Sequence, residues 1–228
     1  MVNVRYIQLL EQMQQNLEAH YGHTGWWPAD SPFEVAVGAI LTQNTAWVNV
    51  TKAIANLKVA DWLDPRAILA ASDAALHEAL RPAGYFRVKT DRLRHFCRYL
   101  VDNHGGSMAA MAELPLEALR TELLAVKGIG PETADCILLY ACGKPVFVID
   151  AYTRRVLRRH GIAMADAPYD ELRRWFEEHL GRDEALWREF HALFVYVGKD
   201  FCRTRARCEG CPLEPLLDPN AASPASRP

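Results

Sequence analysis

The spacing of apolar residues constrains this chain more than any other feature of its sequence. Apolar side chains recur three and four positions apart in stretches such as Tyr6–Leu17 and Leu116–Leu124, which is the period of a helix with one buried face. Segments that alternate with the two-residue period of a strand are almost absent. Glycine and proline interrupt the periodic stretches at intervals typical of short helices. The pattern predicts an all-α protein of roughly ten helices.

Length and hydropathy place the chain among globular proteins. Its 228 residues are 50% hydrophobic, which is enough for one large domain or two small ones. No apolar run approaches the ~20 residues of a membrane span, and the N-terminus lacks a charged-then-apolar signal pattern. We expect a cytoplasmic, nucleoid-associated protein with no membrane partner.

Basic residues are concentrated in three windows of the sequence. The net charge of -2 and the pI of about 6.4 argue mildly against a nucleic-acid partner. Yet residues 87–98 hold five basic residues against one acidic, residues 127–160 hold six against three, and residues 199–207 hold four against one. A phosphate backbone responds to local potential. The windows are therefore compatible with DNA binding, and solvated helix faces are the alternative.

The most informative segment is a turn between two helical stretches. A helix predicted over 116–125 leads into Val126-Lys-Gly-Ile-Gly-Pro131, which we call the hairpin, and a second helix follows over 132–142. Two glycines around one apolar residue make a tight turn with exposed backbone N–H groups, and such a turn before a helix N-terminus can hold a phosphate. Lys127, Gly128 and Gly130 are therefore candidate DNA contacts, with Ile129 as the buried anchor. Many helix–helix turns contain glycine, so the turn alone does not decide its role.

A buried apolar run over 146–149 and then Asp150 follow the second helix, and Asp150 opens an arginine-rich helix that ends at Gly161. The hairpin and the aspartate at this spacing resemble the helix-hairpin-helix/Gly-Pro-Asp DNA glycosylases, the superfamily of endonuclease III, the mismatch adenine glycosylase and 3-methyladenine DNA glycosylase III. The resemblance covers about residues 20–217. It implies a double-stranded DNA partner that contains a damaged base, and we expect a monomer.

The resemblance also implies an architecture of two helical lobes with a DNA-binding cleft between them. One lobe spans 29–145 and contains the hairpin. The other joins residues 1–28 to residues 146–217 and carries a cysteine loop. The alanine-, serine- and proline-rich end, 218–228, is expected to be a disordered tail.

Asp150 is the catalytic residue that the resemblance implies. Cleavage of an N-glycosidic bond places positive charge on the sugar, and a nearby carboxylate stabilises it and can orient or deprotonate the attacking water. Aspartate is also a favoured N-cap worth ~1 kcal/mol. The two roles are compatible, because a helix N-terminus helps to keep the carboxylate ionised.

The chain departs from endonuclease III at Glu132. Endonuclease III has a lysine two residues after the second hairpin glycine, and that lysine forms a Schiff base. A carboxylate cannot do so. We therefore expect a monofunctional DNA N-glycosylase, a hydrolase that releases the base without efficient strand cleavage. Glu132 could instead be only a favourable acid in a first helical turn.

The base pocket is predicted from aromatic residues. Trp26-Trp27-Pro28 and the segment from Leu41 to Trp47 look like the pieces with which 3-methyladenine DNA glycosylase III lines its pocket. Core packing is the alternative for paired tryptophans. The resemblance gives the base-pocket candidates Trp26, Trp27, Trp47, Lys199 and Glu132.

Electron-rich aromatics suit a cationic base through cation–π attraction, which favours alkylated purines as the substrate. An endonuclease III-type glycosylase acting on oxidised pyrimidines and a catalytically silent lesion-binding protein are the alternatives. Gln43, Asn44 and Tyr85 lie where the superfamily fills the gap left by a flipped base. Arg154, on the helix that Asp150 opens, completes the DNA-binding candidates.

Three of the six cysteines are clustered, in the pattern Cys202-x5-Cys208-x2-Cys211. The pattern resembles the iron–sulfur loop of endonuclease III, whose fourth cysteine is missing here. The resemblance implies a [4Fe-4S] cluster held by three thiolates, with Glu214 or Asp218 available as an oxygen ligand. Zinc bound in the same way and a metal-free vestige remain open. The other cysteines, Cys97, Cys136 and Cys142, are expected to be small core residues.

Overall fold

The computed structural model describes residues 4–181 and 183–217. In these residues the chain forms helices, turns and loops and no β-strand, so the predicted all-α class is confirmed. No helix among them is long and apolar enough to cross a membrane. The tail predicted at 218–228 lies outside the described residues.

The chain divides into two compact units. One is Trp27–Lys144, and the other joins the chain up to Trp26 to the chain from Pro145 onward. We call them the hairpin unit and the terminal unit.

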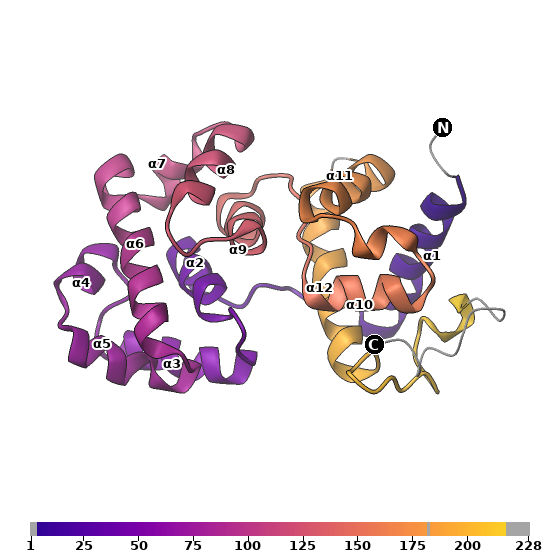
Figure 1. Ribbon diagram of the computed structural model, residues 1–228, viewed down its shortest axis with the longest axis horizontal. Helices are drawn as coiled ribbons and strands as arrows, with labels where there is room; N and C mark the ends of the chain where they lie inside the picture. Colours follow the sequence, from indigo (N-terminus) through magenta and orange to yellow (C-terminus); the bar gives the residue numbers. More distant parts are fainter. Residues whose placement is uncertain (1–3, 182, 218–228) are drawn as a thin grey trace. The chain divides into compact units, whose positions relative to one another are not determined.

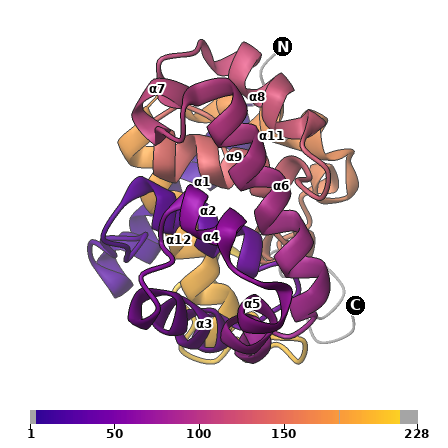
Figure 2. The same ribbon diagram turned by 90° about the vertical axis from the view of Figure 1, so that its left-hand side faces the viewer.

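The hairpin unit is built around an apolar helix, α2 (Pro32–Leu41). Nine of its ten residues are buried, as expected of a helix that is apolar on every side. The side chain of Ser31 caps it by accepting a hydrogen bond from the N–H of Glu34 at 3.1 Å. Figures 1 and 2 show α6 running from the end of the unit with α3 and α5 toward the end with α7 and α8. The remaining α-helices of the unit are α3 (Trp47–Val59), α4 (Pro65–Ala70), α5 (Asp73–Leu80), α6 (Phe86–His104), α7 (Met108–Ala112), α8 (Leu116–Ala125) and α9 (Pro131–Cys136).

The second helix of the hairpin changes its winding midway. After α9 the chain continues as a π-helix over Ile137–Ala141, where the sequence predicted an uninterrupted α-helix over 132–142. A π-turn adds a residue to one turn and rotates the side chains beyond it, and such turns are frequent at functional sites. Here Tyr140, which is 4% exposed, lies in the π-turn.

The terminal unit contains α1 (Val4–Tyr21), α10 (Ala151–Arg159), α11 (Tyr169–Leu180) and α12 (Glu184–Asp200). The run Val146–Ile149 lies in its core, where Phe147 stacks on Phe176 with ring centroids 4.2 Å apart. Helices α10 and α12 approach closely at Gly198, because a Cβ there would stand 2.4 Å from the ring of Tyr152. This close packing places the first turn of α10 beside α12.

Candidate active site and DNA-contact elements

Asp150 caps α10, and one of its oxygens is held by the helix it opens. Its Oδ1 accepts hydrogen bonds from the backbone N–H of Thr153 at 2.7 Å and from the hydroxyl of Thr153 at 2.8 Å. The carboxylate is largely buried, with 9% of the residue exposed. The N-cap role is confirmed, and it fixes the carboxylate through one oxygen while Oδ2 points elsewhere.

Two basic side chains of α12 act electrostatically on Asp150. Nε2 of His191 lies 3.8 Å from Oδ2 of Asp150. Burial lowers the pKa of His191 although the charge of Asp150 opposes this, so the imidazole is neutral at pH 7. Burial also lowers the pKa of Lys199, again against the attraction of Asp150. A histidine on an apolar helix gives no functional signal by itself, and the sequence did not single out His191.

Lys199 and Trp26, both pocket candidates, are in contact in the terminal unit. The ammonium nitrogen of Lys199 lies 5.3 Å from the centroid of the Trp26 ring, within the range of a cation–π interaction. Trp26 also meets Tyr196 edge-to-face at 6.2 Å. The structure therefore assembles Asp150, Lys199 and an aromatic face from elements far apart in the sequence.

The hairpin unit gathers a second aromatic cluster. Trp27 meets Trp47 edge-to-face at 5.1 Å and Tyr140 at 5.4 Å. The backbone of Gly38 in α2 lies under the Trp27 ring, since a Cβ at this position would stand 3.2 Å from it. Two predicted pocket residues are thus together, and Tyr140 of the π-turn joins them without having been predicted. Glu132 is exposed in the first turn of α9.

The hairpin has the backbone geometry of a tight turn with an open face. Ile129 is 5% exposed and anchors the turn, as predicted. Gly128 has a φ of +94°, which L-residues rarely adopt, and the side chain of Arg92 packs where its Cβ would be. Gly130 is extended, and a Cβ there would meet nothing within 4 Å. Lys127, Gly128 and Gly130 are all exposed.

Gln43 links the hairpin to the loop between α2 and α3. Its Nε2 donates to the carbonyl oxygen of Gly128 at 3.2 Å and to Oγ1 of Thr133 at 2.8 Å. Its Oε1 accepts from Arg92. All the polar atoms of the Gln43 side chain are therefore engaged within the unit.

Asn44 and Tyr85 lie on two loops with unusual backbone. Asn44 has a φ of +53° and is exposed, and Tyr85 has a φ of +45° and is 73% exposed. Left-handed backbone at a non-glycine residue persists only where the surrounding structure holds it. The two side chains project from constrained loops.

The arginines of α10 serve mainly to hold neighbouring loops. Arg154 donates to the carbonyl oxygens of Ala165 and Ala167 at 2.8 and 2.9 Å. Arg155 and Arg159 donate to the backbone of the cysteine loop, residues 201–217. These hydrogen bonds give the three arginines a structural role that the sequence did not predict, and the DNA contact of Arg154 stays a prediction.

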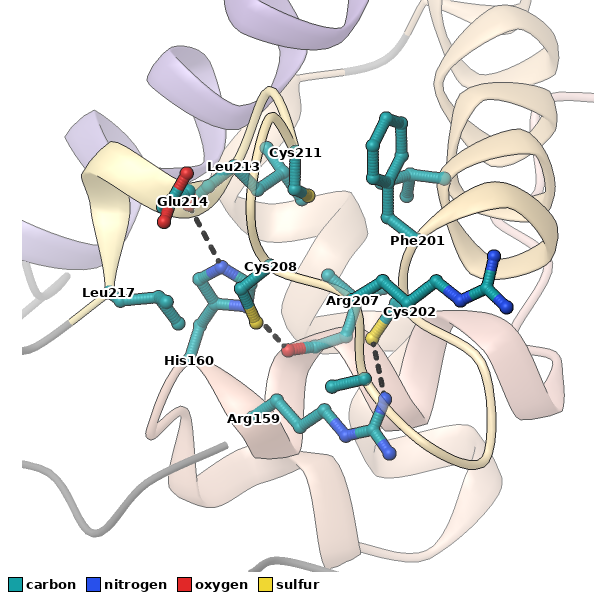
Figure 3. Close-up of a pocket in the computed structure, with 13 residues that line it drawn as sticks. Arg159, His160, Phe201, Cys202, Arg207, Cys208, Cys211, Leu213, Glu214 and Leu217 are labelled. Atoms are coloured by element: carbon teal, nitrogen blue, oxygen red, sulfur yellow. Dashed lines mark hydrogen bonds between the residues drawn. The ribbon is translucent and has the colours of Figure 1, made fainter. Parts of the chain in front are cut away.

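The three clustered cysteines line one cavity, drawn in Figure 3. Nη1 of Arg159 donates to Sγ of Cys202 at 3.2 Å. Burial raises the pKa of the Cys208 and Cys211 thiols, whereas backbone N–H groups of Leu213 and Glu214 lower that of Cys211. For Cys208 the effect of burial outweighs the opposing positive charge of Arg159. His160, which sequence reasoning missed, also lines the cavity.

No three side chains of His, Cys, Asp or Glu form a group that could hold a metal ion, within the part of the chain that the structure describes. The cavity nevertheless combines three sulfur atoms with N–H groups directed at two of them. Hydrogen bonds to sulfur are a regular feature of iron–sulfur sites. A cluster of several irons and sulfides is wider than one ion, so its thiolate ligands need not converge as closely. The residues present fit a cluster on these grounds.

Residues 37–182 match the HhH-GPD superfamily of base excision DNA repair proteins. The match covers more than half of the chain and includes both the hairpin and Asp150. The chain belongs to this superfamily, and it is a DNA glycosylase of the endonuclease III-like kind.

Individual relatives agree with this placement. A protein of Methanocaldococcus jannaschii, named as a candidate DNA repair glycosylase, is 43% identical over 208 residues, 91% of this chain and 94% of that protein. The H. pylori 3-methyladenine DNA glycosylase bound to 1,N6-ethenoadenine has a TM-score of 0.72 at 29% identity, over 85% of this chain and 96% of that one. A non-covalent endonuclease III–DNA complex has a TM-score of 0.79 at 22% identity, over 92% and 94% of the two chains. At 22% identity, the similarity to the endonuclease III complex supports only a shared fold.

Proposed function

We propose that the protein is a monofunctional glycosylase that extrudes a damaged base from duplex DNA and hydrolyses its N-glycosidic bond with Asp150 as the essential carboxylate. The observation that carries the proposal is the fixed, largely buried carboxylate of Asp150 at the N-cap of α10, with Oδ2 left to act. The hairpin would bind a DNA phosphate through its exposed backbone, as helix N-termini and glycine turns do.

The chemistry follows from the charge of this group. As the bond between C1′ and the base nitrogen breaks, the electron pair leaves with the base and positive charge grows on the sugar. The Asp150 carboxylate stabilises that charge in a site from which water is mostly excluded. Water then adds to C1′ and its proton is accepted by Asp150 or by solvent. Because burial lowers the pKa of His191, this imidazole does not neutralise the carboxylate.

Glu132 is the reason to propose hydrolysis alone. A Schiff base requires an amine, and a carboxylate at the first turn of α9 cannot supply one. The products would therefore be the free base and an abasic site in an intact DNA strand.

Alkylated purines are the proposed substrate class. The Trp27–Trp47 edge-to-face pair offers aromatic surface of the kind that stacks on an extruded base. The Trp26 face already attracts one cation, Lys199, as it would a cationic alkylated purine. The likeness to the H. pylori enzyme, which was solved with an etheno-adenine, favours a modified adenine.

A [4Fe-4S] cluster is the proposed cofactor, with Cys202, Cys208 and Cys211 as its thiolate ligands. Such a cluster supplies structural cross-linking of the loop and a redox-active centre. The exposed Arg203, Arg205 and Arg207 lie between the cysteines and would face DNA.

The test is base release from a panel of duplexes, each with one alkylated purine, etheno-purine or oxidised pyrimidine. Products are assayed with and without alkaline treatment, because an intact abasic strand breaks only with alkali. We expect release of an alkylated purine, alkali-dependent breakage, and loss of both in Asp150→Asn. Release of oxidised pyrimidines with alkali-independent nicking would favour the endonuclease III-type activity. Binding to lesion DNA without release of the base would indicate a catalytically silent lesion-binding protein.

A further inference from the structure

Lys89 is a fully buried lysine that the proposed chemistry does not use. It lies in the first turn of α6, and 1% of the residue is exposed. Burial is the main cause that lowers its pKa to about 8, with a smaller effect of Arg92, so the ammonium form predominates at pH 7. A buried ammonium requires hydrogen-bond acceptors for its protons.

Three oxygen atoms, one from the last residue of α2 and two from the loops that follow α2 and α5, surround this ammonium. Its nitrogen donates to the carbonyl oxygen of Leu41 at 2.8 Å and to that of Ala83 at 2.7 Å, and it also donates to Oγ1 of Thr45. The Thr45 hydroxyl in turn donates to the carbonyl oxygen of Ala83 at 2.6 Å. The α2–α3 loop, residues 42–46, and the α5–α6 loop, residues 81–85, are thereby joined through one cation.

Each of these loops contains an exposed non-glycine residue with left-handed backbone. Asn44 stands next to Thr45, and Tyr85 stands two residues after Ala83. The backbone N–H of Lys89 also bonds to the carbonyl oxygen of Tyr85 at 3.0 Å. An exposed tyrosine can displace a base from a stack only if its own backbone is held rigidly in place. The hydrogen bonds of Lys89 would provide that rigidity.

We propose that Lys89 is a positioning residue that fastens the 42–46 and 81–85 loops to each other, so that Asn44 and Tyr85 enter duplex DNA as one rigid wedge during base extrusion. This inference rests on the proposed function. It assigns Lys89 no contact with DNA and no part in bond cleavage. Its effect must therefore appear in extrusion of a paired base and not in excision of a base that is already unpaired.

The main test compares Lys89→Met with the unmodified protein on two DNAs with the same lesion. In one the lesion is paired within a duplex, and in the other it lies in a three-nucleotide unpaired bubble. Single-turnover excision from the duplex should fall about 10-fold or more, since opening a base pair is unfavourable and the wedge must stabilise the opened state. Excision from the bubble should change less than about twofold. Equal losses on the two DNAs, or no loss on the duplex, would overturn the proposal.

Coupling to Tyr85 provides a second test. In Tyr85→Ala the wedge side chain is gone, so adding Lys89→Met should reduce duplex excision little further. Full additivity would show that Lys89 does not act through Tyr85. The same variants are measured by 2-aminopurine fluorescence next to the lesion, which reports unstacking whether or not any base is excised. Lys89→Met should reduce that signal in duplex DNA, and an unchanged signal would also refute the wedge.

Two further variants separate positioning from folding. Thr45→Val removes the bridging hydroxyl and leaves the two carbonyl contacts of Lys89, so it decides the question if Lys89→Met does not fold. Like Lys89→Met, it should lower the ratio of the excision rate on the duplex to that on the bubble. An unchanged ratio would contradict the proposal. Tyr99→Phe is the matched control, because it removes a hydrogen bond from the same helix to Glu122, 2.8 Å in length, without touching either loop. Its ratio should stay that of the unmodified protein. If bubble excision survives Asp150→Asn, the proposed function fails, while the fluorescence still tests the wedge.

Discussion

Replacing Asp150 by asparagine separates its two roles. Asparagine keeps an oxygen that can accept the two hydrogen bonds from Thr153, at 2.7 and 2.8 Å, and it is as good an N-cap as aspartate. The substitution removes only the negative charge. Since the residue is 9% exposed, it also removes the cost of desolvating a carboxylate beside the buried His191. We expect the free energy of unfolding to change by less than about 1 kcal/mol.

Catalysis should respond much more strongly than stability. Loss of one preorganised group that stabilises developing charge costs about 100- to 1,000-fold in rate, or ~2.7–4 kcal/mol. Asp150 is the only carboxylate assigned to that task, so we expect base excision to fall at least about 100-fold. Binding to DNA should be unchanged or slightly stronger, because a negative charge near phosphates is gone.

Single-turnover excision on the duplex whose lesion is excised fastest measures the loss of catalysis, and thermal unfolding measures the change in stability. Asp183→Asn is the matched control. Asp183 is the N-cap of α12 in the same unit and accepts the N–H of Leu186 at 3.0 Å, and it is exposed. It should lose neither activity nor stability. A folded Asp150→Asn protein that excises bases at a near-normal rate would refute the reasoning about charge.

Three further outcomes are expected. Gly130→Val should keep its stability but bind damaged and undamaged duplexes more weakly, because its side chain would project from the open face of the hairpin; weakening on lesion DNA alone would argue against a backbone role. Borohydride should trap little covalent adduct with the unmodified protein, and Glu132→Lys should increase trapping. As the pH falls below about 6.5, thermal stability should drop, because the unfolded chain takes up protons that buried His191 and His160 resist; His160→Gln should flatten this slope.

Local sequence patterns were sufficient to predict the elements around the hairpin and Asp150. The helix over 116–125, the buried run over 146–149 and the N-cap at Asp150 all occur as predicted. Each depends on local pattern, namely apolar spacing, a capping side chain or a glycine turn. Ile129 is buried for the same local reason, as the one apolar residue between two glycines.

Contacts between distant segments could not be derived in this way. His191 lies beside Asp150 because α10 and α12 pack against each other, and Gly198 permits their close approach. Lys89 appeared in the sequence as one charge of a basic window, yet its three acceptors come from residues 6–48 positions away and remove it from the surface. The π-turn that contains Tyr140 likewise has no local signal. Such features depend on tertiary packing, which decides which residues meet and which buried backbone groups still need a hydrogen-bond partner.

Helix α10 explains how a cysteine loop can persist with three cysteines. Arg155 donates to the carbonyl oxygen of Cys202 at 2.5 Å, and Arg159 donates to those of Arg203 and Thr204 at 2.6 and 2.8 Å. These bonds fasten the start of the loop to α10 without any metal. Loss of a cluster ligand therefore removes one anchor among several, and Asp150 at the other end of α10 keeps its place. It follows that Cys208→Ala should lose iron, from about four per chain, while Asp150-dependent excision persists; the reverse, iron retained and excision lost, would contradict this division between cluster and carboxylate.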